Sequence, residues 1–265
     1  MIGSYSKRGI GLRCALGGVV LLATISRLWA ADLDSSLQAR LSSDRLGHLE
    51  PGTYEAGEKG EFELGVAGSK YLLRSKGSVE VFVLAPDSAA MGGRILRYDS
   101  GETAIQVSGW GGVTFYTDAN PQGLPAVRSG GTPTFAPSPA SADDIRVAAL
   151  DLGEAMNRAH RMNVGFSVNW STVPDTSVAR ARTLDALENI ARGIERLGHF
   201  PQWRQAIARR ICEITLAKGE TPAVTLSGKN LLITFNPDTG YEGRASSRAI
   251  ATALGTLLGS PQKQS

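Results

Sequence analysis

Cysteine and histidine are scarce in this chain, and that scarcity excludes two ways of stabilising a fold. The 265 residues include two cysteines and three histidines. Cys14 lies in an N-terminal segment that we expect to be removed, which leaves Cys212 without an internal disulfide partner. His48, His160 and His199 are not spaced as metal ligands. The sequence therefore predicts neither a disulfide framework nor a structural metal site.

Familiar catalytic motifs are also missing. No Gly-x-Ser-x-Gly nucleophile elbow is present. An Asp-Thr-Gly tripeptide at Asp238 resembles the catalytic loop of aspartic proteases, but that chemistry needs two carboxylates, and the chain has no second copy. Its setting, NPDTGYEG, is typical of a β-turn. The sequence therefore assigns no catalytic residue and no cofactor.

The apolar run CALGGVVLLATIS near the N-terminus is too short for a comfortable membrane span. It follows three basic residues, and only 13 residues separate Arg13 from Arg27. As a helix these would cover about 20 Å, against roughly 30 Å of bilayer hydrocarbon. A secretory signal peptide over residues 1–31 is favoured, with cleavage near Ala30 or Ala31. We expect a periplasmic or secreted protein with no transmembrane anchor after cleavage.

The excess of positive charge belongs to that N-terminal segment. Removing residues 1–31 takes away four of the 28 basic residues and none of the 25 acidic ones, which leaves a net charge of −1. The charge therefore gives no support for nucleic-acid binding. What remains is uneven, because residues 32–126 carry 8 basic and 13 acidic side chains, whereas residues 127–265 carry 16 and 12.

Between residues 51 and 126, short β-prone runs separated by turn residues predict an antiparallel β meander. The runs are EFELGV, KYLLRS, VEVFVLA, GRILRYD, TAIQVSG and VTFYT. VEVFVLA is the most continuous apolar run and predicts a central strand, whereas GRILRYD and TAIQVSG alternate and predict strands with one wet face. Before the meander, a weak leucine pattern over residues 32–50 predicts an N-terminal helix.

The stretch GWGGVTFYTDANPQG, from Gly109 to Gly123, is interpreted as a tight bend between two strands. A phosphate-binding glycine loop would feed a helix N-terminus, and this one feeds a strand. Trp110 and Tyr116 form a minority alternative, an aromatic lip for a ligand.

The runs EVFVL, Glu80 to Leu84, and GWGGVTFYT together resemble a family of secreted alphaproteobacterial proteins of unknown function, in which a signal peptide precedes a β-rich segment with a Trp-Gly-Gly strand. The resemblance covers roughly residues 70–127. It implies a Gram-negative envelope setting and transfers no catalytic residue.

After residue 126 the pattern changes. Residues 127–141, rich in Pro, Ser and Gly, predict a linker or long loop. Residues 142–260 then predict a helical α+β part. Its expected elements are a helix over 141–162 with Ser141 as N-cap, a strand over 163–171, an αα-hairpin over 177–219, a β-hairpin over 223–235 and a helix over 246–258.

Seven arginines lie on the predicted αα-hairpin, off its apolar stripe. Arg192, Arg196 and Arg204 are the ones we single out as a surface for a weak anionic partner in the envelope. A solvated helix face with local ion pairs, or packing against the acidic β-rich part, is favoured over such binding. Cys212 falls beside Ile211 on the apolar stripe and is predicted to be buried and inert.

These patterns predict an α+β fold, with an N-terminal antiparallel β meander followed by a helical part containing an αα-hairpin and a short β-hairpin. The leading functional hypothesis is an exported, non-catalytic binding or envelope-associated module, whose partner the sequence leaves unknown. The alternative is a periplasmic hydrolase whose site is assembled from residues distant in sequence. A pocket with converging acids, or a histidine beside a carboxylate, would favour the enzyme.

Overall fold

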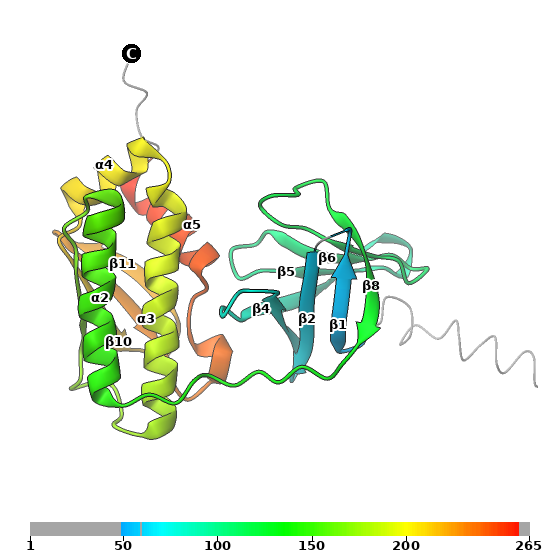
Figure 1. The fold of residues 1–265 in the computed structure, drawn as a ribbon, viewed down its shortest axis with the longest axis horizontal. Coiled ribbons are helices and arrows are strands. Elements are labelled where there is room, and N and C mark those ends of the chain that lie inside the picture. The colour runs from blue at the N-terminus through cyan, green and yellow to red at the C-terminus, as the bar shows by residue number, and fades with distance from the viewer. Residues whose placement is uncertain (1–48, 59, 260–265) are drawn as a thin grey trace, which may run out of the picture.

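The computed structural model describes residues 49–58 and 60–259, which form two parts joined by an extended segment (Figure 1). The first part is a β-barrel, and the second is a set of helices packed on another sheet. The predicted signal peptide over residues 1–31 and most of the predicted helix over residues 32–50 lie outside the described residues. Among the described helices, none has the length and apolar character needed to cross a membrane.

Eight antiparallel strands follow one another around the barrel in chain order, and pairing of β1 with β8 closes it. The strands are β1 Gly52–Ala56, β2 Gly60–Ala67, β3 Lys70–Ser75, β4 Phe82–Ser88, β5 Arg94–Arg97, β6 Thr103–Val107, β7 Val113–Phe115 and β8 Leu124–Gly130, with the short 3-10 helix η1 Ala90–Gly92 between β4 and β5.

The closed barrel shows that the expected open meander followed by a helical part is wrong. The six predicted runs correspond to β2 through β7, and the two strands that were not predicted, β1 and β8, are the pair that closes the barrel. β1 is a five-residue strand with a single aromatic residue, and β8 contains Pro125 and ends in Ser-Gly, as a linker would. Pairing across the barrel overrides these weak local propensities. As a result, β8 crosses the expected boundary between residues 126 and 127.

Side chains fill the barrel. Tyr54 and Phe62 stack with ring centroids 5.0 Å apart, and Phe115 packs 4.4 Å from Phe62. Leu64 and Leu84 on the inner face are fully buried. An eight-stranded barrel is just wide enough for such a filling, so its interior is a packed core rather than a ligand cavity.

The second part is a two-layer α/β arrangement. Its sheet has the order β11-β12-β10-β9, with β9, β10 and β12 parallel and β11 antiparallel at one edge. The elements are α2 Ala142–His160, β9 Gly165–Val168, α3 Ser177–Gly198, α4 Pro201–Arg210, β10 Glu213–Lys218, β11 Ala223–Ser227, β12 Asn230–Phe235, the short 3-10 helix η2 Gly240–Gly243 and α5 Ser247–Leu258.

Helices α2 and α3 run side by side across one face of this sheet (Figure 1). Ile190 and Ile194 of α3 belong to the same buried cluster as Ile214 and Leu216 of β10. The predicted start of α2 is confirmed, since Ser141 and Asp144 form a reciprocal capping box. α5 packs against α3 on the side that faces the barrel.

The predicted αα-hairpin is wrong in its second helix. α4 ends at Arg210, and Glu213–Lys218 is the central strand β10 rather than the continuation of a helix. The spacing of Ile207, Ile211 and Ile214 fits a helical stripe, but Ile214 and Leu216 also fit one face of a strand. Parallel pairing with both β9 and β12 decides between the two periodicities.

Candidate ligand-binding cleft

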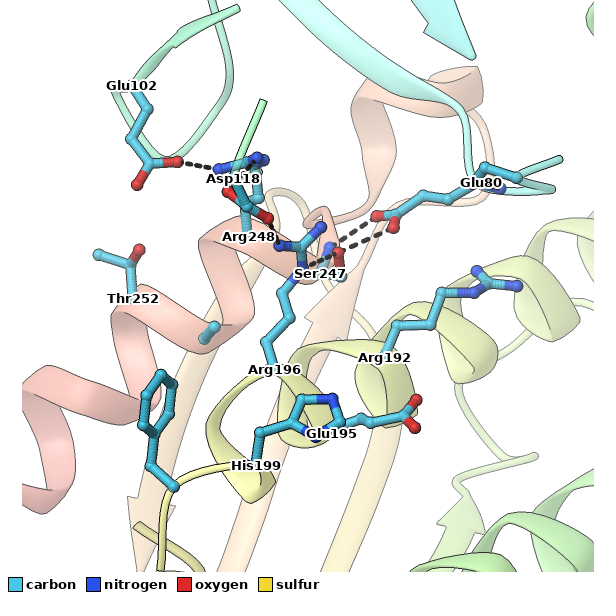
Figure 2. Close-up of a pocket in the computed structure, with 13 residues that line it drawn as sticks. Glu80, Glu102, Asp118, Arg192, Glu195, Arg196, His199, Ser247, Arg248 and Thr252 are labelled. Atoms are coloured by element: carbon cyan, nitrogen blue, oxygen red, sulfur yellow. Dashed lines mark hydrogen bonds and ion pairs between the residues drawn. The ribbon is translucent and has the colours of Figure 1, made fainter. Parts of the chain in front are cut away.

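A cleft of about 650 Å³ lies where one end of the barrel meets α3 and α5 (Figure 2). The barrel contributes Glu80, Glu102 and Asp118. The helices contribute Arg192, Arg196 and Arg248. More than seventy residues of sequence separate the barrel's contribution, which ends at Asp118, from that of the helices, which begins at Arg192.

One side of the cleft is built on the N-terminus of α5, which two barrel carboxylates cap. Asp99 accepts hydrogen bonds from the N–H of Ser246, at 2.7 Å, and from its hydroxyl. Glu80 accepts from the N–H and the hydroxyl of Ser247, each at 2.8 Å. The first N–H groups of a helix lack intrahelical partners and attract negative charge. These contacts hold the first turn of α5, and with it Arg248, against the barrel.

Arg248 and Arg196 converge on one barrel carboxylate. Asp118 accepts from Nη2 of Arg248 at 2.5 Å and from Nη1 of Arg196 at 2.6 Å. Arg248 also pairs with Glu102, and its guanidinium carbon lies 4.4 Å from the centre of the Tyr98 ring. The Arg248 side chain is only 11% exposed, whereas the side chain of Asp118 is 62% exposed. Two largely buried guanidinium groups thus pair with one exposed carboxylate.

The network favours the charged forms of Asp118 and Arg248. Burial opposes ionisation of Asp118, but hydrogen bonds and charge from Arg196 and Arg248 outweigh it and lower its pKa. Burial likewise works against the charge of Arg248, yet Tyr98 and the acidic partners raise its pKa. Burial raises the pKa of Tyr98 to about 12, with the charge of Arg248 opposing the rise.

Gly193 lets α5 approach α3 closely, which brings Arg196 and Arg248 together beside Asp118. A Cβ atom at position 193 would lie 2.7 Å from a side-chain carbon of Ile250 and 3.0 Å from the carbonyl oxygen of Ser247. At this crossing, Nε of Arg196 donates to the hydroxyl of Ser247 at 2.8 Å. A larger residue at 193 would push the helices apart and separate the two arginines from Asp118.

The structure gathers three of the five surface residues singled out from the sequence. Arg192 and Arg196 line the cleft. Tyr116 lines an adjoining hollow of about 580 Å³, which shares Glu102, Asp118 and Arg248 with the cleft. Trp110 lies instead in the turn between β6 and β7, and Arg204 lies on α4 outside the residues that line the cleft.

Two residues that sequence reasoning missed, Glu80 and Arg248, carried a local signal. Glu80 is an acid beside the most apolar strand, and it is buried with 3% exposure. A buried acid requires a partner. Arg248 is a cation in the first turn of a helix, where the helix dipole disfavours positive charge. A buried acid and a cation at a helix N-terminus are each unfavourable alone. Contacts between the two parts supply both with partners of the kind they need.

One further sequence prediction, the burial of Cys212, is wrong. Cys212 is exposed rather than buried, because α4 ends before it and the helical stripe does not reach it. The ring of His160 packs against Gly198 of α3 and lies 5.8 Å from the ring of His199. In the part of the chain that the structure describes, no three His, Cys, Asp or Glu side chains gather to hold a metal ion.

Comparison with known proteins gives a family and no assigned activity. A family model described as "Domain of unknown function (DUF4908)" matches residues 35–254. No curated protein and no solved structure matches the chain. The matched range spans both the barrel and the α/β part, so the cleft between them lies within a single family domain.

Proposed function

The chain belongs to the DUF4908 family, and from that premise we propose that it is a non-catalytic binding module of the bacterial envelope, which holds a small acidic ligand in the junction cleft. The observation that carries this proposal is the cleft itself. Its volume of about 650 Å³ falls in the range typical of small-molecule sites, and both structural parts contribute to its walls.

Arg192 is the wall residue through which the cleft would take an acidic ligand, because Arg196 and Arg248 already pair with Asp118. Arg192 lies in the cleft, and its partners Glu188, at 2.7 Å, and Asn189, at 2.6 Å, come from its own helix. An acid group of a ligand could take over one branch of this guanidinium while the helix keeps the other. Ser78 and Thr252 add hydroxyl groups, and Phe200 and Ala251 add apolar surface.

The hydrolase alternative draws less support from the same residues. Converging acids are present, but a general acid works best with a pKa near the working pH, and Arg196 and Arg248 lower the pKa of Asp118. Ser247 is a nucleophile-type side chain, yet it is fully buried and donates its hydroxyl hydrogen to Glu80. Both features fit binding and helix capping better than turnover.

Two exposed threonines on α5 allow the cleft to be tested. Thr252 lines the cleft, and Thr256 lies one helical turn further on, outside the lining. We expect inorganic phosphate, succinate or the dipeptide alanyl-glutamate to raise the melting temperature in a saturable way. Thr252→Phe should abolish that rise by filling the cleft, and Thr256→Phe should keep it. A rise that survives Thr252→Phe would place binding elsewhere.

The envelope setting rests on the basic and apolar pattern of residues 1–31 and on the resemblance to secreted proteins. We expect expression in a Gram-negative host to yield a periplasmic protein that begins near Ala31 or Asp32. N-terminal sequencing of the isolated protein checks this, and a chain that still begins at Met1 would contradict it.

A further inference from the structure

Two loops at the same end of the barrel form a single projecting tip. One is the β4–β5 connection, residues 89–93, and the other is the β6–β7 turn, residues 108–112. They touch through their backbones, because a Cβ on Gly109 would lie 2.1 Å from the carbonyl oxygen of Met91. Only a glycine fits that contact. The two loops therefore keep a fixed relation to one another.

Each loop presents one large apolar side chain to solvent. Trp110 is 88% exposed and Met91 is 81% exposed, more than any other large hydrophobic residue that the structure describes. Met91 also has a φ of 58°, a left-handed backbone conformation that a side chain of its type rarely adopts. The fold thus holds Met91 outward in a strained backbone conformation, and such strain often marks a functional position.

The loops carry no charge of their own. Residues 89–93 read AAMGG and residues 108–112 read SGWGG, so the other side chains are small. The nearest charged residues already have partners, since Asp87 pairs with Arg97 and Arg94 donates to the hydroxyl of Tyr71. Because neither loop contains a charged side chain, moving the tip out of water does not require the dehydration of an ionised group in either loop.

We propose that this tip, the Met91–Trp110 tip, inserts into the interfacial region of a lipid bilayer. Tryptophan is enriched at membrane interfaces because its ring combines an apolar body with a polar N–H group. A protein partner fits less well, because stable protein interfaces bury roughly 1,200–2,000 Å² and two exposed side chains offer far less. The proposal does not depend on the cleft ligand.

Insertion of these two side chains is weak and reversible. A single myristoyl chain gives an association constant of only about 10⁴ M⁻¹, and the two side chains are together no more apolar than that chain. The tip therefore orients the protein on a surface that it visits repeatedly, and it does not anchor it.

Quenching of Trp110 by brominated acyl chains tests the insertion directly. The full chain is used in a Trp29→Phe background, and a Trp110→Phe variant supplies the emission of Trp170 and Trp203 for subtraction. With phosphatidylethanolamine–phosphatidylglycerol vesicles, we expect the Trp110 emission to shift to the blue and to be quenched. Every variant keeps the same N-terminal segment, so any contribution of that segment to vesicle binding cancels in the comparison.

Two substitutions and one matched control locate the contact. Trp110→Ser and Met91→Asn should each weaken vesicle partitioning by about fivefold or more, as expected for lost apolar burial. Asparagine suits the left-handed backbone at position 91, so the loop is kept. Val127→Ser removes an apolar side chain that is 72% exposed on the barrel wall, and it should leave partitioning unchanged.

Three outcomes would overturn the proposal. One is a wild-type Trp110 that brominated lipid does not quench. Another is partitioning that the tip substitutions leave unaltered. The third is a lipid-independent shift of Trp110 emission that rises with protein concentration, together with a dimer in sedimentation that Trp110→Ser abolishes, because the tip would then pair two copies of the chain.

Discussion

Glu80 connects the barrel to α5 through a buried carboxylate, and its removal should be costly. Glu80→Gln keeps the shape but loses the charge that accepts from Ser247 and faces the positive end of the helix. We expect a loss of about 1–3 kcal/mol in the free energy of unfolding, measured by urea denaturation. Glu61→Gln is the matched control, since Glu61 pairs with Lys76 at the surface, and it should cost below about 0.5 kcal/mol. Equal losses would mean that the cap contributes nothing.

Asp118 should make the junction sensitive to acid. Its pKa is lower in the folded protein than its ordinary value of 3.8, because Arg196 and Arg248 outweigh the effect of burial. Its contribution to stability is therefore complete above about pH 3.8 and is lost as the pH falls through the lowered pKa. Denaturation from pH 5 to pH 2 should show this loss, and Asp118→Asn should flatten the difference. If Asp118→Asn shows the same pH dependence of stability as the wild type, Asp118 is not the source of the acid sensitivity.

Cys212 should react readily in the native protein, contrary to its sequence-based prediction. The residue is exposed between the end of α4 and the start of β10. In a Cys14→Ser background, a thiol reagent should label the folded chain at a rate close to that in denaturant. Labelling that requires unfolding would argue for burial after all.

At the scale of elements, the sequence revealed segments whose pattern is strong in isolation. The capping box of α2, the strand β9, the α3 stripe and the β11–β12 hairpin are all confirmed. Sequence patterns failed to predict segments whose structure is decided by pairing with other strands. β1 and β8 have weak strand patterns, and they form strands because pairing between them closes the barrel. β10 is a strand because it pairs with both β9 and β12. The cleft could not be predicted for the same reason, since Glu80, Asp118 and Arg248 meet only after both parts fold and dock.

At the crossing of α3 and α5, we expect two glycine-to-alanine substitutions to change the stability of the protein in opposite directions. Gly193→Ala should destabilise by about 1–3 kcal/mol, because the new Cβ would lie within 3.0 Å of atoms in Ile250 and Ser247. Gly255→Ala lies on α5 with its nearest neighbour 3.9 Å away, so it should instead stabilise by about 0.5–1 kcal/mol through helix propensity. Thermal denaturation of both variants measures the contrast. Two changes of the same sign would contradict the close approach at position 193.

At the scale of the whole molecule, the uneven charge along the chain reappears as contact between the two parts. Glu102 and Asp118 of the acidic barrel meet Arg196 and Arg248 of the basic α/β part. Arg74 reaches the connecting segment, where its guanidinium lies over the Phe135 ring and donates to the carbonyl of Thr134. Opposite charges of the two parts therefore pair at the junction, which is the packing that the sequence favoured over binding of an external anion, and Arg196 and Arg248 are engaged there.

Arg244 offers the sharpest test of whether the two parts unfold together. Its side chain is only 4% exposed, pairs with Asp185 of α3 and donates to the carbonyl oxygen of Val81 at 2.8 Å. Arg244→Ala leaves Asp185 without its partner, and breaking a buried pair in this way costs about 3–5 kcal/mol. Because the lost contact with Val81 joins the barrel to the α/β part, the loss should fall on the coupling between them.

Differential scanning calorimetry should accordingly show one transition for the wild-type protein and two for Arg244→Ala, with the first transition at a lower temperature. Arg158→Ala is the control, because its pair with Glu154 is exposed on α2 and should shift the melting temperature little. If Arg244→Ala melts in a single transition that is merely displaced, the other junction contacts, led by Glu80 and Asp99 at the start of α5, are enough to keep the two parts cooperative. If the wild type already melts in two steps, the barrel and the α/β part unfold separately. A ligand that binds the cleft between them should then raise the temperature of the lower transition first.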